Sequence, residues 1–289
     1  MNPRSPKLRA ATRGHYDIQK LRIQAGNRIV AQFKATLGYE SGVKEDANDD
    51  PDAKAILKQS RAAYNTITEA VANVTKRSFK ADGIISDFTE YTLVDQWVRL
   101  NEAEAQSAKH IKVAVESEPI WGAFLADVRG CGPLMAAVII SEIDIYKSRY
   151  PSSLFAYAGL DVGPDGRGRS KRKEHLVKWD YTDTDGNAAK RNGITFNPFL
   201  KTKLVGVLGS SFLKVGQGDK YADAYYNYKN RLEQHPAHVE KTKGQRANMA
   251  TRYAVKLFLL DLYNAWRALE SLPVEPPYHE AKLGIYHRA

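Results

Sequence analysis

Two glycines separated by a single residue mark the stretch Val128-Arg129-Gly130-Cys131-Gly132-Pro133, on which our interpretation of the chain rests. An apolar segment precedes this stretch from residue 119, and a strongly apolar segment follows it as far as residue 145. Glycine allows a tight turn because it adopts positive φ angles at no steric cost. Pro133 suits the first position of a helix, where its missing N–H is not needed. The stretch therefore predicts a helix-hairpin-helix, with helices over residues 119–128 and 133–145.

The turn of a helix-hairpin-helix is suited to holding a phosphate. Its glycines let the backbone come close to the anion, and the first N–H groups of the second helix donate hydrogen bonds to it. Such contacts position a protein on a nucleic acid without reading the bases. We predict that Arg129, Gly130 and Gly132 bind nucleic acid, the alternative being a packed αα-hairpin with a glycine turn. Cys131 has apolar neighbours and is interpreted as a small turn residue instead of a reactive thiol.

The rest of the chain also favours helices, so the fold class is predicted to be mainly α. In residues 1–115, apolar residues at helical spacing predict an N-terminal long-helix bundle, with helices over 15–37, 53–77 and 88–115. This region also holds a basic arm over 1–13, expected to be mobile, and an acidic loop over 38–52. A C-terminal helical domain is expected over residues 118–272, followed by a tail over 273–289. It adds helices over 151–160, 196–215, 219–233 and 243–272, and an irregular basic loop or hairpin over 161–193.

The charge of the chain points to an anionic partner. Lys and Arg number 43 against 33 Asp and Glu, which gives a net charge of +10 and a pI near 9.4. Nucleic acid is the commonest partner for such a chain, and the alternative is a basic protein whose charge serves solubility. No run of about 18 apolar residues and no secretory signal is present, so no membrane association is expected. The single cysteine excludes an internal disulfide, and we expect a cytoplasmic protein.

A second motif, over residues 163–173, combines glycine, basic side chains and one serine. Its backbone is flexible and its cations suit a phosphodiester, so we predict that Arg167, Arg169, Lys171, Arg172 and Lys173 bind nucleic acid. The hydroxyl of Ser170 can attack phosphorus in such surroundings, where Arg and Lys stabilise the developing charge. The alternative is a loop that only contacts nucleic acid, with Ser170 hydrogen-bonded to a phosphate.

Three other patterns are assigned no ligand. Residues 183–187 resemble a fragment of a calcium loop but lack its glutamate, so we interpret them as a turn. His235 and His238 enclose Pro236, which argues against a metal site. The tyrosines between residues 221 and 228 have helical spacing and are expected to pack in the core instead of stacking on bases. No metal site and no cofactor are predicted.

The order of the motifs resembles a known family. Gly130-x-Gly132 and its apolar helix are followed by Leu154-Phe155-Ala156-Tyr157-Ala158-Gly159-Leu160, then by Pro164 and Ser170, and later by Asn197-x-x-Leu200-Lys201-x-x-Leu204. Over residues 118–270 this order is similar to the C-terminal domain of the Piv-type invertases and insertion-sequence transposases, whose relatives are guided by a bridge RNA. The resemblance implies that Ser170 is the nucleophile of a DNA recombinase and that Asn197 and Lys201 belong to the nucleic-acid-binding set.

The chain departs from this family in several places. The family's metal-binding RuvC-like N-terminal half is replaced by a helical region, so a divalent metal is expected only if a site not visible in this sequence supplies it. Arg129 stands where the family has proline, and Lys171 stands where it has glycine after the serine. Two hypotheses therefore remain open: a serine recombinase or transposase, and a binding module for DNA or structured RNA derived from one. Recombination would also require a homo-oligomer or a second subunit.

Overall fold

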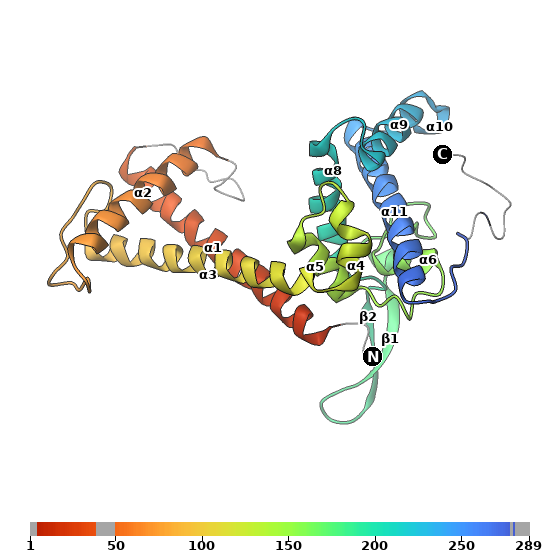
Figure 1. Cartoon of the computed structure of the whole chain (residues 1–289), viewed down its shortest axis with the longest axis horizontal. Helices are drawn as coiled ribbons and strands as arrows, with labels where there is room; N and C mark the ends of the chain where they lie inside the picture. Colours follow the sequence, from red (N-terminus) through yellow and green to blue (C-terminus); the bar gives the residue numbers. More distant parts are fainter. Residues whose placement is uncertain (1–4, 39–49, 278–279, 281–289) are drawn as a thin grey trace. The chain divides into compact units, whose positions relative to one another are not determined.

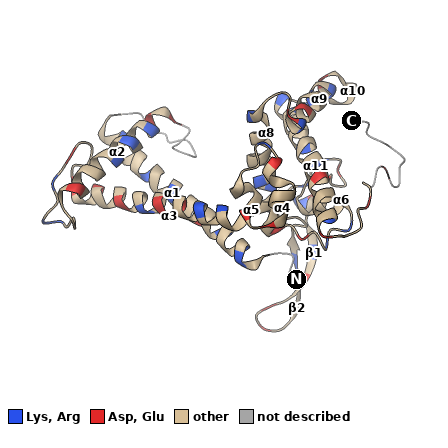
Figure 2. Ribbon diagram, viewed as in Figure 1, with Lys and Arg blue, Asp and Glu red and all other residues tan. Residues whose placement is uncertain are grey.

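The computed structural model describes residues 5–38, 50–277 and 280, and it is mainly helical, as predicted (Figure 1). The chain divides into two compact units, one formed by residues 10–111 and the other by residues 1–9 and 112–289. Lys and Arg occur along the helices of both units, interspersed with fewer Asp and Glu (Figure 2). No helix within the described residues is long and apolar enough to cross a membrane.

The unit of residues 10–111 is built from three helices: most of α1 (Pro6–Thr36), α2 (Pro51–Ala70) and most of α3 (Phe88–Glu116). Their facing apolar stripes form one core, which includes Ile29, Phe33, Ile56 and Val94. Asp50 caps the start of α2 by accepting a hydrogen bond from the N–H of Asp52, and it also pairs with Lys34 at 2.8 Å. The predicted long-helix bundle is therefore found here.

Two predictions for this region are wrong in part. Residues 6–13 are not a mobile arm: Pro6 begins α1, and Arg9 forms an ion pair with the buried Glu142. The second helix ends at Ala70 instead of residue 77, because Val71 leaves helical geometry with φ −144° and ψ 121°. Residues 1–4 and most of the acidic loop, at 39–49, lie outside the described residues.

The second unit gathers shorter helices around one long helix, α11 (Lys243–Leu269). The helix α5 (Pro133–Glu142) is buried almost all round, as expected for a helix that is apolar on every face. The helix α11 packs against several other elements of the unit, including α6 (Pro151–Tyr157), α8 (Gly209–Val215) and α9 (Lys220–Gln234). Further helical elements in the described part of this unit are α4 (Pro119–Ala123), η2 (Leu125–Asp127), η3 (Lys173–His175), α7 (Pro198–Thr202), η4 (Lys203–Leu208) and α10 (Pro236–Val239).

Residues 161–193 contain more order than predicted. The strands β1 (Val177–Thr182) and β2 (Ala188–Gly193) form a regular antiparallel hairpin, which projects from the helices of its unit (Figure 1). Its turn is residues 183–187, as predicted, and the carboxylate of Asp183 closes it by accepting hydrogen bonds from two backbone N–H groups. The preceding residues, 161–176, form the loop that carries Ser170.

Candidate functional site

A tight turn shapes the first half of the basic loop. Gly163 donates a backbone hydrogen bond to Arg167 at 2.7 Å, and Gly166 donates one to Gly163 at 3.0 Å. Gly166 has φ +71°, a conformation that favours glycine. The carboxylate of Asp165 accepts the N–H of Arg167 at 3.0 Å, which fixes the carboxylate against the turn. The sequence Pro-Asp-Gly is typical of such a turn.

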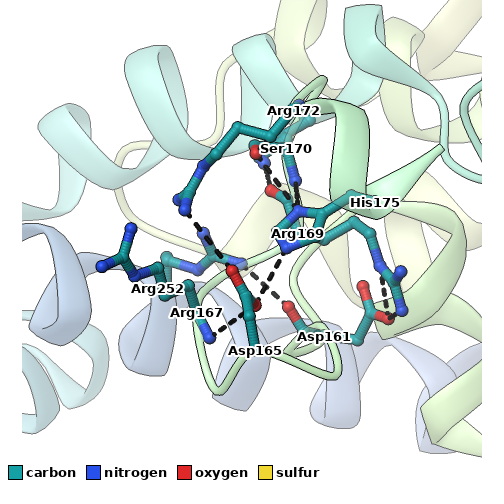
Figure 3. A network of polar contacts seen from close by, with 9 residues as sticks. Asp161, Asp165, Arg167, Arg169, Ser170, Arg172, His175 and Arg252 are labelled. Carbon is teal, nitrogen blue, oxygen red and sulfur yellow. Dashed lines mark hydrogen bonds and ion pairs between the residues drawn. The ribbon is translucent and has the colours of Figure 1, made fainter.

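Ser170, His175 and Asp165 are linked in series by hydrogen bonds (Figure 3). The Oγ of Ser170 lies 3.2 Å from Nδ1 of His175, and Nε2 of His175 lies 2.9 Å from Oδ1 of Asp165. The His175 side chain is completely buried, whereas Asp165 is partly exposed. This is the order of nucleophile, base and orienting carboxylate that activates serine in many enzymes.

The backbone determines which nitrogen of His175 carries the proton. The N–H of Ser170 points at Nδ1 from 3.0 Å, and a backbone N–H can only donate. Nδ1 therefore presents its lone pair to Ser170, and Nε2 carries the proton that it donates to Asp165. In this tautomer the lone pair of His175 Nδ1 accepts the backbone N–H of Ser170 and also lies 3.2 Å from the Ser170 hydroxyl, within the reach of a general base.

Asp165 is held in its ionised form. The backbone N–H of Arg167 lowers its pKa most, followed by the hydrogen bond from His175, and the charge of Arg172 adds to the effect. Arg172 lies 3.5 Å from the same carboxylate. A carboxylate that stays charged at and below neutral pH stabilises the imidazolium that forms when His175 takes a proton.

Two glycines make room for this arrangement. A Cβ on Gly163 would lie 2.6 Å from Nε2 of His175 and 3.0 Å from Oδ1 of Asp165. A Cβ on Gly168 would lie 2.3 Å from Nη1 of Arg252, which belongs to α11. A methyl group on Gly163 would press on the ring of the buried His175, so the contact between His175 and Asp165 requires glycine there, whereas at Gly168 the end of the flexible Arg252 side chain could move aside.

We expect Gly163→Ala to separate Asp165 from His175, because the new methyl group would overlap the contact between them. Loss of the orienting carboxylate typically lowers the rate of such sites by about 100-fold or more. The ring ¹⁵N chemical shifts of His175 would report the change of tautomer by NMR. Gly122→Ala is the control, since nothing lies within 4 Å of a Cβ there. Unchanged shifts in Gly163→Ala would contradict the described contact.

The predicted cations of the loop do not act alike. The guanidinium of Arg169 binds Asp161 at 2.6 and 3.0 Å, and this carboxylate raises the pKa of Arg169. Arg169 therefore fixes the loop, and its charge is already compensated. Arg167, Lys171, Arg172 and Lys173 are exposed, and Arg172 also pairs with Asp165 at 3.5 Å. We retain these four as candidate ligands of a phosphodiester.

Lys201 and Arg252 reach the loop from two helices. The ammonium of Lys201 donates to the carbonyl of Arg169, and burial together with the charge of Arg252 lowers its pKa to about 8. The guanidinium of Arg252 donates to the carbonyls of Gly159 and Asp161 at 3.1 and 3.2 Å. Both side chains therefore hold the backbone on either side of the turn. Lys201, predicted to bind nucleic acid, acts here as a support of the loop.

Asn197, also predicted to bind nucleic acid, is engaged within the protein. Its side-chain oxygen accepts the N–H of Leu200 and so caps α7. Its side-chain nitrogen donates to the buried Glu142 at 2.6 Å and to the hydroxyl of Tyr157 at 3.1 Å. Because both ends of the amide are used, Asn197 stabilises the junction of three elements.

The helix-hairpin-helix turn has the predicted outline, with α4 and η2 before it and α5 after it. Gly130 has φ +88°, and a Cβ there would lie 3.3 Å from atoms of Ser211 and Val215. The backbone of Gly130 therefore packs closely against α8. Gly132 is exposed, with nothing within 4 Å of its missing Cβ, and Arg129 is exposed beside it. Burial raises the pKa of the Cys131 thiol to about 12, so Cys131 is not a reactive thiol at neutral pH.

No family model, curated protein or solved structure matches this chain. The resemblance to transposases therefore stays a prediction based on the order of the motifs. Within the described residues, no group of three or more His, Cys, Asp and Glu could hold a metal ion. The geometry of the serine loop is thus the main evidence on function.

Sequence reasoning missed the partners of Ser170. Asp165 and His175 lie five residues before and after it, so a serine flanked by an acid and a histidine in one loop was the available signal. Asp161 and Arg252 offered no comparable signal, because Arg252 lies more than 80 residues further along the chain. Its approach to the loop depends on how α11 packs.

Proposed function

We propose that this protein binds nucleic acid and breaks and joins phosphodiester bonds through Ser170, as a recombinase or transposase. The observation that carries the proposal is the unprotonated Nδ1 of His175 at 3.2 Å from Ser170 Oγ, with ionised Asp165 bound to Nε2 on the other side of the ring. The exposed cations of the same loop support a phosphodiester as the substrate. The motif order that resembles serine transposases agrees with this chemistry.

In the proposed reaction, His175 Nδ1 takes the proton of Ser170 while Oγ attacks phosphorus. The bond between phosphorus and the leaving oxygen breaks, and that oxygen takes the proton back from His175. A phosphoserine link to one strand end results. The hydroxyl of a second strand end then attacks the phosphorus, and its proton returns to Ser170 as the link breaks. Lys171 and Arg172 stabilise the charge that develops on the phosphate oxygens.

A second candidate is a binding module that does not cut. One observation favours it: Nδ1 of His175 is closer to the N–H of Ser170, at 3.0 Å, than to its hydroxyl, at 3.2 Å. The hydroxyl also accepts the N–H of Arg172 at 3.3 Å. The same contacts can thus brace the loop as a phosphate-binding surface without chemistry. The two candidates differ in whether a covalent product forms.

Binding itself is tested with duplex DNA, single-stranded DNA and a hairpin RNA at 50 and 200 mM salt. Exposed cations predict an affinity that falls about 10- to 100-fold over this range, because each phosphate contact releases counterions. The charge-reversed variant Lys171→Glu should weaken binding further, whereas Lys58→Glu, an exposed residue of the other unit, should have a smaller effect. No binding to any ligand at 50 mM salt would overturn the nucleic-acid proposal and leave a basic helical assembly protein.

A further inference from the structure

A cavity of about 680 Å³ lies beside the serine loop, between that loop and the helices α9, α10 and α11. Among the described residues, no Asp or Glu lines the cavity, and five of its lining residues are Lys or Arg: Arg167, Arg172, Lys241, Arg252 and Lys256. Arg167 and Arg172 belong to the serine loop, whereas the other three come from the segment that leads into α11 and from α11 itself. The cavity therefore joins the serine loop to a second, unassigned set of cations.

Arg252 and Lys256 are one helical turn apart on α11, so their side chains lie on the same face. Burial lowers the pKa of Arg252, and burial together with the charge of Arg252 lowers the pKa of Lys256. The charge of Asp161 offsets part of this lowering for both side chains, and its Oδ2 already accepts two hydrogen bonds from Arg169. Two like charges held together in a partly buried place are destabilising, and a bound anion would remove that cost.

The other walls of the cavity suit a flat, polar ring. Tyr228 and Tyr253 are stacked on each other, with ring centroids 4.4 Å apart and planes 8° apart, and both line the cavity. Gln245 and Asn248 add side-chain amides, and Nδ1 of His238 is buried there with no hydrogen-bond partner in the described part of the chain. Aromatic rings stack on bases, and amides bond to base edges.

We propose that this cavity binds one nucleotide with its phosphate against Lys256 and Lys241 and its base against the tyrosines. The inference deepens the proposed function and rests on it in one respect: Arg167 and Arg172 connect the cavity to the serine loop, so the nucleotide would belong to the strand presented to Ser170. A free nucleotide offers the same phosphate and base as a strand end, and the experiment below distinguishes these two ligands.

The test measures binding by fluorescence anisotropy, with a single-stranded oligonucleotide that carries or lacks a 5′-phosphate. We expect the 5′-phosphate to tighten binding about tenfold, the effect of one charge-assisted contact. Lys256→Gln and, separately, Lys241→Gln should remove this difference. Lys243→Gln, which removes an exposed charge at the start of α11 and does not line the cavity, should preserve it. Circular dichroism and thermal unfolding of each variant show whether it is folded.

Competition by adenosine and by adenosine 5′-monophosphate separates the two sources. Displacement of the phosphorylated strand by micromolar monophosphate, with adenosine inactive, would assign the cavity to free nucleotides; displacement only at millimolar concentration would assign it to strand ends. Equal affinity for strands with and without the 5′-phosphate would overturn the inference. So would an equal loss of the 5′-phosphate effect in Lys243→Gln and Lys256→Gln. Ser170→Ala should retain the 5′-phosphate effect. If the 5′-phosphate tightens binding but the wild-type protein forms no covalent adduct with DNA, the nucleotide-binding cavity is supported and catalysis by Ser170 is excluded.

Discussion

Replacing Ser170 with alanine should lower the rate of covalent adduct formation with DNA by at least about 1000-fold, because the attacking oxygen is removed. Binding should change by less than about threefold, since the cations that contact phosphate remain. The rate is measured as labelled DNA that stays with the protein on a denaturing gel. Ser210→Ala is the control: Ser210 is exposed, and its hydroxyl donates to the carbonyl of Gly206 in the same helical run.

A substitution of His175 tests whether it acts together with Ser170. His175→Gln should lower the rate by about 100-fold or more, because no base then accepts the proton of Ser170. Residues that act as one unit have non-additive effects, so Ser170→Ala combined with His175→Gln should be no slower than Ser170→Ala alone. An adduct that forms at the wild-type rate in Ser170→Ala would exclude Ser170 as the nucleophile and favour the binding module.

The second large effect concerns stability. Arg267 is buried in α11 and donates hydrogen bonds to the carbonyls of Ile145, Ser148 and Pro273. It thereby ties the long helix to the segment after α5 and to the chain that leaves α11. Arg267→Met keeps much of the apolar volume but leaves these buried carbonyls without donors. We expect the free energy of unfolding to fall by about 3–5 kcal/mol.

This loss is measured by urea denaturation followed by circular dichroism. Arg129→Met is the matched control, because Arg129 is exposed, and it should change the free energy of unfolding by less than about 0.5 kcal/mol. A loss below about 1 kcal/mol in Arg267→Met would show that water reaches these carbonyls and that Arg267 does not hold the helix.

Much of the fold can be predicted because its helices have clear local signals. Apolar periodicity predicts a helix over residues 88–115, and α3 spans Phe88–Glu116. Prolines predict the starts of α4, α5 and α6, because proline is favoured at the first helical position. Helix ends are harder to predict: the apolar pattern continues through Val71 and Val74, but α2 has already ended at Ala70.

The hairpin of β1 and β2 could not be predicted with the same certainty. Its side chains are almost all exposed, so no apolar alternation marks a buried face. The strands are defined by backbone pairing: residues 177–182 pair with residues 188–193 across a short turn, with Trp179 opposite Arg191. Similarly, residues 1–13 predict a mobile arm because they combine basic side chains with two prolines and no acid, whereas Arg9 is held by Glu142 from a distant helix.

Only Ser170 and the cations next to it in the sequence could be predicted as parts of the candidate site. Ser170 and the exposed cations around it follow from local composition, because glycine and basic residues in one loop suit a phosphodiester. The orientation of His175 depends on the Pro-Asp-Gly turn and on the bare backbone of Gly163, which only the structure reveals. Lys201 lies in the predicted motif but supports the loop, because it donates to the carbonyl of Arg169. Asn197 lies in the same motif but stabilises the helix junction, because it donates to the carboxylate of Glu142.

The most direct test of the central claim is to find which residue carries the nucleotide. Wild-type protein is incubated with DNA and, separately, with hairpin RNA, denatured, digested with nuclease and protease, and examined by mass spectrometry. We predict a nucleotide bound through phosphate to the peptide that contains Ser170, and none in Ser170→Ala. A nucleotide on a different residue, or none although the same sample binds the nucleic acid, would contradict serine catalysis at this loop.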